Sequence, residues 1–119
     1  MEDKPTRVLL VEDNSADARL LKELLRDEPA DLEFVDAENL AGALKLLKNE
    51  SFAVILLDLS LPDSAGFGTF SAVHESAPDV PIVVLTGLHD ETIAVKSVEG
   101  GAQDYLIKGQ VDTLRDRAA

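Results

Sequence analysis

Short apolar runs recur along the chain and are separated by longer segments with helical spacing. The first run, residues 7–11, reads RVLLV, and the strongest, residues 52–57, reads FAVILL. Neither run alternates with polar residues, which is typical of strands that are covered on both faces. Similar or weaker runs at 32–35, 81–85 and 104–107 predict three further strands.

Apolar residues three and four positions apart follow the first four runs and predict helices. In 16–26 they lie on one face, and Asn14 or Ser15 can cap the start of the helix. The same spacing predicts helices over 39–49, 67–77 and 91–99, and a last helix over 110–117. Only Val111 and Leu114 are clear core residues of the last helix, so it is expected to be short or truncated.

This alternation of strands and helices predicts an α/β fold. Short loops that carry Gly, Pro or Asp join the units, which favours a five-stranded parallel sheet, doubly wound, with helices on both faces. The chain of 119 residues fits one domain over 1–119. A dinucleotide-binding fold is disfavoured, because no Gly-x-Gly-x-x-Gly follows the first strand.

The formal net charge of −12 narrows the classes of partner. It opposes direct binding to the phosphates of nucleic acids and to anionic membrane surfaces. The longest uncharged apolar stretch, 52–57, is far shorter than the ~20 residues that span a bilayer. The absence of cysteine excludes a disulfide scaffold and a thiolate metal site, and a cytoplasmic location is expected.

Polar or charged residues follow four of the five predicted strands. Glu12 and Asp13 come after the first, Asp58 after the third, Thr86 after the fourth and Lys108 after the fifth. Taken singly, each is an ordinary helix cap, turn residue or surface charge. Because parallel strands end at one edge of the sheet, where ligands bind in such folds, these residues together predict one site.

The three acids in this predicted site would repel one another unless cations were present. A divalent Mg²⁺ together with Lys108 would supply +3 against −3, and carboxylates, a backbone carbonyl and water are the oxygen ligands that Mg²⁺ prefers. Phosphoryl transfer needs an in-line nucleophile and positive groups around the phosphoryl oxygens. Asp58 can be the nucleophile, and Lys108 and the Thr86 hydroxyl can receive the charge.

Four segments together resemble the receiver domain of two-component response regulators, of the chemotaxis-receiver type. They are 8–14 (VLLVEDN), 55–62 (ILLDLSLP), 83–87 (VVLTG) and 101–109 (GAQDYLIKG). The resemblance spans nearly the whole chain, and the combination of motifs is highly specific. It implies a flavodoxin-like sheet with the strand order 2-1-3-4-5.

The resemblance also implies a role for each residue of the predicted site. Asp58 is the phosphoacceptor, and Lys108 contacts the phosphoryl group. Glu12 and Asp13 bind Mg²⁺, for which Mn²⁺ is a substitute. Asp58 and the backbone carbonyl of Ser60 complete the protein ligands of the metal.

A switch and its partners are implied in the same way. Thr86 is the switch hydroxyl, and Tyr105 is the aromatic switch that turns inward when Thr86 moves towards the phosphate. The switch biases the face formed by the fourth helix, the fifth strand and the fifth helix. The implied partners are a histidine kinase or histidine phosphotransfer protein as donor, a downstream output protein or domain, and in some relatives a second copy in a homodimer.

Three residues depart from the family pattern. Gly109 stands where the family often has a proline, which leaves the isomer of the Lys108–Gly109 bond open. Asp63 adds a negative charge in the loop after the phosphoacceptor. Leu88 lies two residues beyond Thr86, at a position that influences the access of water, so a long-lived phosphoryl group is the hypothesis.

Two other functions compete with a phosphoaspartate signalling module that is not an enzyme and reacts only on itself. A Mg²⁺-dependent phosphohydrolase with an aspartate nucleophile typically has a second acid two residues later and a cap domain. This chain has Ser60 there and no room for a cap. A degenerate receiver that serves only as a binding platform is disfavoured, because the whole set of site residues is present.

Overall fold

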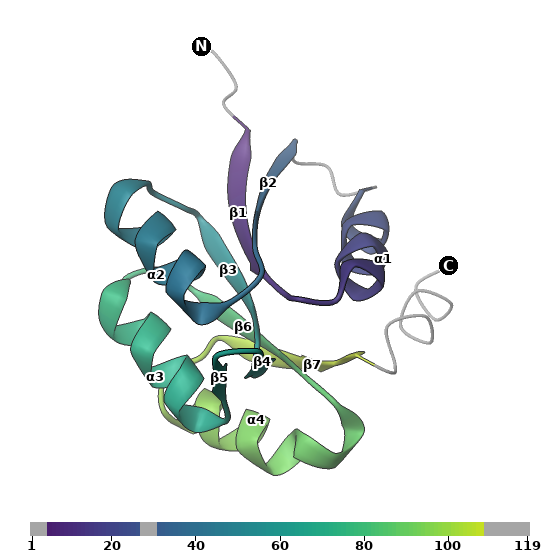
Figure 1. Cartoon of the computed structure of the whole chain (residues 1–119), viewed down its shortest axis with the longest axis vertical. Coiled ribbons are helices and arrows are strands. Elements are labelled where there is room, and N and C mark those ends of the chain that lie inside the picture. The colour runs from purple at the N-terminus through teal and green to yellow at the C-terminus, as the bar shows by residue number, and fades with distance from the viewer. Residues whose placement is uncertain (1–4, 27–30, 109–119) are drawn as a thin grey trace.

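The computed structural model describes residues 5–26 and 31–108 and contains one five-stranded sheet (Figure 1). Its strands are β1 (Thr6–Val11), β2 (Leu32–Ala37), β3 (Val54–Asp58), β6 (Ile82–Thr86) and β7 (Asp104–Ile107). They lie in the order β2-β1-β3-β6-β7, and all neighbouring pairs are parallel. The predicted sheet and its strand order are therefore confirmed.

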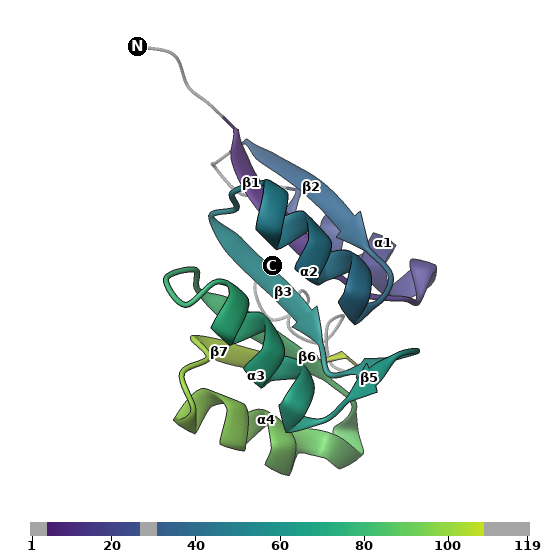
Figure 2. The same cartoon turned by 60° about the vertical axis from the view of Figure 1, so that its left-hand side comes forward.

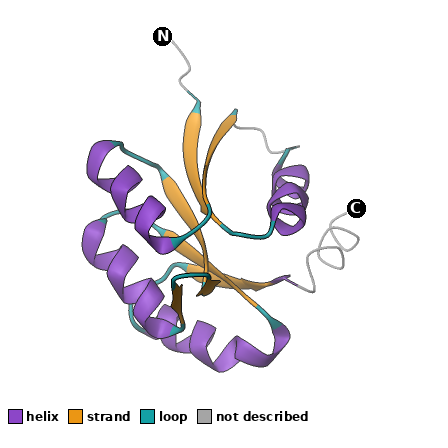
Figure 3. Cartoon of the chain, viewed as in Figure 1, coloured by secondary structure: helices purple, strands orange, loops and turns teal. Residues whose placement is uncertain are grey.

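Helices cover both faces of this sheet (Figures 2 and 3). They are α1 (Ser15–Leu25), α2 (Leu40–Asn49), α3 (Phe67–Ser76) and α4 (Glu91–Glu99), with a 3-10 turn, η1 (Leu88–Asp90), before α4. Helix α1 lies on one side of the sheet, whereas α2, α3 and α4 lie on the other side. The predicted helix over 110–117 falls outside the described residues. Over 5–26 and 31–108, no helix has the length and apolar character that crossing a membrane requires.

Asparagine side chains fix where the first two helices begin. The Asn14 side chain accepts a hydrogen bond of 2.9 Å from the Asp17 N–H, and the Asn39 side chain accepts one of 2.7 Å from the Gly42 N–H. Each bond satisfies a backbone donor that the first turn of a helix leaves without a partner. Of the two predicted caps for α1, Asn14 is therefore the one used.

The central strands alternate their side chains between two apolar layers, as the period of two in a strand requires. The layer under α2, α3 and α4 contains Leu9, Val11, Ile55, Leu57, Ile82 and Val84. The layer under α1 contains Val8, Leu10, Leu56 and Leu85, together with Leu21 of the helix. Burial on both faces explains why these runs lack polar alternation.

The ends of the two central strands differ by one residue from the predicted runs. Because Asp58 pairs with Leu85 in register, the acid is the last residue of β3 instead of the first residue of a loop. Thr86 pairs with Ile107 and likewise belongs to β6. Both polar side chains are thus held by the ladder of the sheet, which gives them a fixed position.

A small antiparallel ribbon in the loop after Asp58 was not predicted. Its strands, β4 (Ser60–Leu61) and β5 (Ser64–Ala65), are too short to show a periodic pattern in the sequence. Gly66 directly precedes α3 and has φ 84°, which a residue with a side chain rarely adopts; its N–H donates to the Leu59 carbonyl at 2.8 Å. The loop is therefore an ordered continuation of β3.

The substitution Leu57→Ala should destabilise the chain by about 2–5 kcal/mol, because Leu57 is fully buried between the sheet and its helices. Urea unfolding followed by circular dichroism measures this free energy. Leu88→Ala is the control and should cost less than about 0.5 kcal/mol, because the Leu88 side chain is 58% exposed. Equal costs for the two variants would contradict the burial of Leu57.

Candidate functional site

The sheet brings three of the predicted acids together at the carboxyl ends of its central strands. Val11 lies opposite Leu57 in the register of β1 and β3. The next residues, Glu12 and Asp58, therefore lie side by side at the carboxyl ends of these neighbouring strands. One oxygen from each of Glu12, Asp13 and Asp58 lies within 4.8 Å of the others. Glu12 is 4% exposed and Asp58 is 1% exposed, whereas Asp13 faces the solvent.

Lys108 reaches this acid cluster from the far edge of the sheet. It follows β7, and its ammonium lies 3.1 Å from Glu12 Oε1 and 3.1 Å from Asp58 Oδ2. A third carboxylate, Asp17 Oδ2 of α1, also lies 3.1 Å from the same nitrogen. Segments at opposite ends of the sequence therefore meet in one charged site, and the predicted meeting of Lys108 with the acids is confirmed.

Backbone donors hold the two buried carboxylates in place. The Asn14 N–H donates to Glu12 Oε2 at 3.1 Å, and the Ser60 N–H donates to Asp58 Oδ1 at 3.0 Å. Each carboxylate oxygen has more than one lone pair, so these bonds leave acceptor capacity for a cation. The predicted contribution of the Ser60 carbonyl to a metal remains a prediction.

Burial and the proximity of the charges shift two pKa values. Burial, together with the neighbouring Asp58 carboxylate, raises the pKa of Glu12 to about 7. Burial by itself lowers the pKa of Lys108, but the hydrogen bonds and charges of Asp58 and Glu12 outweigh it and raise that pKa above its ordinary value. Lys108 therefore carries its proton at neutral pH, whereas Glu12 changes between its protonated and ionised forms near pH 7.

The acid cluster has the chemistry of a site for a hard divalent cation. Glu12, Asp13 and Asp58 carry −3 when ionised, and the ammonium of Lys108 compensates only one of these charges. A divalent cation balances the remainder, and an all-oxygen donor set suits hard ions such as Mg²⁺ and Mn²⁺. The residues present at this edge of the sheet therefore fit a metal ion.

Thr86 and Tyr105 lie near the same edge but make other contacts. The Thr86 hydroxyl is buried and makes a long contact of 3.4 Å with the Gly87 carbonyl. The hydroxyl of Tyr105 donates to Glu91 Oε2 at 2.7 Å, at the start of α4. Among the described residues, no hydrogen bond joins either hydroxyl to the acid cluster.

Two acids have roles that sequence reasoning missed. Asp17, which contacts Lys108, stands in the first turn of α1, where an acid is usually explained by the helix dipole. Asp63 accepts hydrogen bonds from the N–H groups of Leu40 at 2.8 Å and Ala41 at 3.0 Å, which lower its pKa. Asp63 was expected only as an added charge near the site, and its carboxylate instead caps α2.

The parallel sheet and the acids at its carboxyl edge define a flavodoxin-like protein whose site suits a divalent cation. The chain belongs to the response regulator receiver domain family, which matches residues 8–119. It is 37% identical over 107 residues to the regulatory protein LuxO of Vibrio cholerae, and the match covers 89% of this chain and 23% of LuxO.

Solved receiver structures show the same fold. The phosphorylated cyanobacterial phytochrome response regulator RcpA superposes with a TM-score of 0.78 at 25% identity, over 97% of this chain and 91% of that one. The Mn²⁺-bound response regulator Rcp1 gives 0.78 at 28% identity, over 94% and 91%. Receiver domains are signalling modules of two-component systems and interact with histidine kinases and output domains.

Without a metal, the stability of the folded chain should fall as the pH rises from 4.5 to 7. The pKa of Glu12 is about 7 in the folded state against an ordinary 4.5, so the folded state binds this proton more tightly. The stabilisation is complete below pH 4.5 and is lost as the pH passes 7. The loss is on the order of 3–4 kcal/mol, because the folded value lies about 2.5 above the ordinary one and one pKa unit corresponds to about 1.4 kcal/mol.

Urea unfolding in EDTA at several pH values measures this slope. Glu12→Gln removes the titrating group and should flatten the slope over the same interval. Saturating Mg²⁺ should also flatten it for the unsubstituted chain, because the ion favours the ionised acid. An identical slope for Glu12→Gln and the unsubstituted chain in EDTA would contradict the raised pKa.

Proposed function

We propose that residues 1–119 form one receiver domain that takes a phosphoryl group onto Asp58 in the presence of Mg²⁺. The donor is a histidine kinase or a histidine phosphotransfer protein, and the module reacts only on itself. One observation carries the proposal: the buried Asp58 ends β3 inside the acid cluster, with the Lys108 ammonium 3.1 Å from its Oδ2. A structural aspartate would not need an acid pair and a lysine around it.

The roles of the residues follow from their contacts. An oxygen of Asp58 forms the new O–P bond while the N–P bond of the donor phosphohistidine breaks, and the imidazole leaves with the electron pair. Glu12, Asp13, Asp58 and the Ser60 carbonyl would hold Mg²⁺, which withdraws charge from the phosphoryl oxygens. Lys108 donates to a phosphoryl oxygen, and the N–H of Ser60 keeps the carboxylate oriented.

Two of the similar structures support this assignment. RcpA is a phosphorylated response regulator and Rcp1 is a response regulator with bound Mn²⁺. Because this chain shares their fold, the two proteins support the proposal that one site here takes both a phosphoryl group and a metal. The proposal therefore includes Mn²⁺ as a substitute for Mg²⁺.

The switch that we propose starts from the observed contact of Tyr105 with α4. Phosphorylation draws the Thr86 hydroxyl towards the phosphoryl group and opens space at the end of β6. Tyr105 then gives up its hydrogen bond with Glu91 and turns inward. This rearrangement changes the face that contains α4 and β7, and the output partner reads that face.

The first test is phosphorylation of the purified chain. Acetyl phosphate with Mg²⁺ should add one phosphoryl group by intact mass, and beryllofluoride with Mg²⁺ should shift backbone amide resonances around the acid cluster. Asp58→Asn should show neither effect, because the amide is a poor nucleophile. A chain that keeps one added phosphoryl group after Asp58→Asn would place the acceptor elsewhere.

A second test uses Tyr105, which is the only tyrosine in a chain without tryptophan. Its hydrogen bond to Glu91 raises the pKa of Tyr105, so Glu91→Gln should lower that pKa. Beryllofluoride should change that pKa as well if Tyr105 leaves Glu91 and turns inward, because losing the hydrogen bond lowers the pKa whereas burial of the phenol raises it. Ultraviolet absorbance follows the titration of the phenol.

The control for this titration is Glu99→Gln, at the other end of α4. It removes the same charge from the same helix without touching the Tyr105 hydroxyl, so its effect on the phenol should be small. A Tyr105 titration that is the same in Glu91→Gln, Glu99→Gln and the unsubstituted chain would show that Glu91 does not hold the hydroxyl.

A further inference from the structure

Asp17 is a third anion on the lysine of the site. Its Oδ2 lies 3.1 Å from the Lys108 nitrogen, the same distance as the nearest oxygens of Glu12 and Asp58. The N–H of Asp17 donates to the Asn14 cap, so the start of α1 fixes the position of this residue. The side chain of Asp17 is 36% exposed, whereas Glu12 and Asp58 lie inside.

The three anions differ in what they can do once the site is in use. Glu12 and Asp58 belong to the group of acids whose oxygens could together hold a cation, and Asp17 does not. When a cation engages Glu12 and a phosphoryl group occupies Asp58, those two carboxylates lose their hold on Lys108. Asp17 keeps its hold, because neither ligand uses its oxygens.

We propose that Asp17 is a positioning residue that retains the Lys108 ammonium on the α1 side of the site. This inference rests on the proposed phosphoacceptor function of Asp58. In the resting site, Asp17 shares the ammonium with Glu12 and Asp58 and so weakens its hold on their oxygens, which makes them more available to the cation. In the phosphorylated site, Asp17 competes with the phosphoryl group for the same ammonium and adds a negative charge beside it.

The two effects have opposite signs in Asp17→Asn. The ammonium then rests on Glu12 and Asp58 alone and competes with the cation, so Mg²⁺ should bind about two- to fivefold more weakly. At saturating Mg²⁺ the ammonium is free to contact the phosphoryl group, so beryllofluoride should bind about two- to fivefold more tightly. This range is what a partly exposed ion pair contributes.

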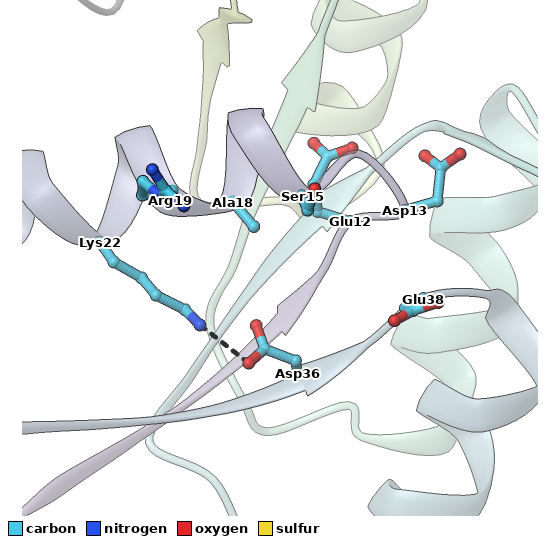
Figure 4. Close-up of a pocket in the computed structure, with 8 residues that line it drawn as sticks. All are labelled: Glu12, Asp13, Ser15, Ala18, Arg19, Lys22, Asp36 and Glu38. Carbon is cyan, nitrogen blue, oxygen red and sulfur yellow. Dashed lines mark hydrogen bonds and ion pairs between the residues drawn. The ribbon is translucent and has the colours of Figure 1, made fainter.

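Asp36→Asn is the matched control for net charge. Asp36 lines the same pocket between α1 and β2 as Glu12 and Asp13, and it pairs there with Lys22 at 2.8 Å (Figure 4). The substitution Asp36→Asn removes one negative charge near the site, as Asp17→Asn does. The ion pair that it breaks, however, is with Lys22 and not with Lys108. Asp17→Glu keeps the charge and should restore both affinities at least in part.

Amide NMR titrations of the whole chain measure both affinities, first with Mg²⁺ alone and then with beryllofluoride at saturating Mg²⁺. Weaker Mg²⁺ binding with tighter beryllofluoride binding in Asp17→Asn, beyond the changes in Asp36→Asn, would support the inference. Changes of one sign, or changes equal to those of Asp36→Asn, would overturn it while the proposed function stands. Failure of the unsubstituted chain to bind beryllofluoride would overturn both.

Discussion

The site depends on one electrostatic constraint, which is that buried carboxylates at the edge of a sheet must share a cation. Glu12 and Asp58 are adjacent because β1 and β3 are neighbours in the sheet. Lys108 reaches them because β7 ends at the same edge, two strands away from β3. A sheet with another strand order would separate the lysine from the acids and leave two buried charges uncompensated, which is costly.

The same constraint links protons to metal ions. With Lys108 as the resident cation, the remaining repulsion is relieved either by a proton on Glu12 or by a divalent ion among the acids. A proton on Glu12 and a divalent ion exclude each other, because the ion needs the ionised carboxylate of Glu12 as a ligand. If the proposed cation binds here, its uptake would therefore release the proton that Glu12 carries below about pH 7.

The sequence was sufficient for the sheet, its order, the four described helices and the meeting of Lys108 with the acids. Apolar runs and helical spacing carry this information locally, and the resemblance to a family supplies the strand order. The strand ends at Asp58 and Thr86 depend on pairing with neighbouring strands, so the runs alone placed them one residue away. The contacts of Asp17 and Asp63 join segments far apart in the chain, and neither spacing nor propensity reports such contacts.

The capping of α2 by Asp63 has a further consequence for the loop after the phosphoacceptor. The loop is tied at one end to β3 and at Asp63 to the first two amides of a helix that precedes it in the chain. A displacement of this segment that broke the tie would release the donors of Leu40 and Ala41 to solvent. Hydrogen exchange at these two amides, which belong to another element of the chain, therefore reports whether the loop keeps its position.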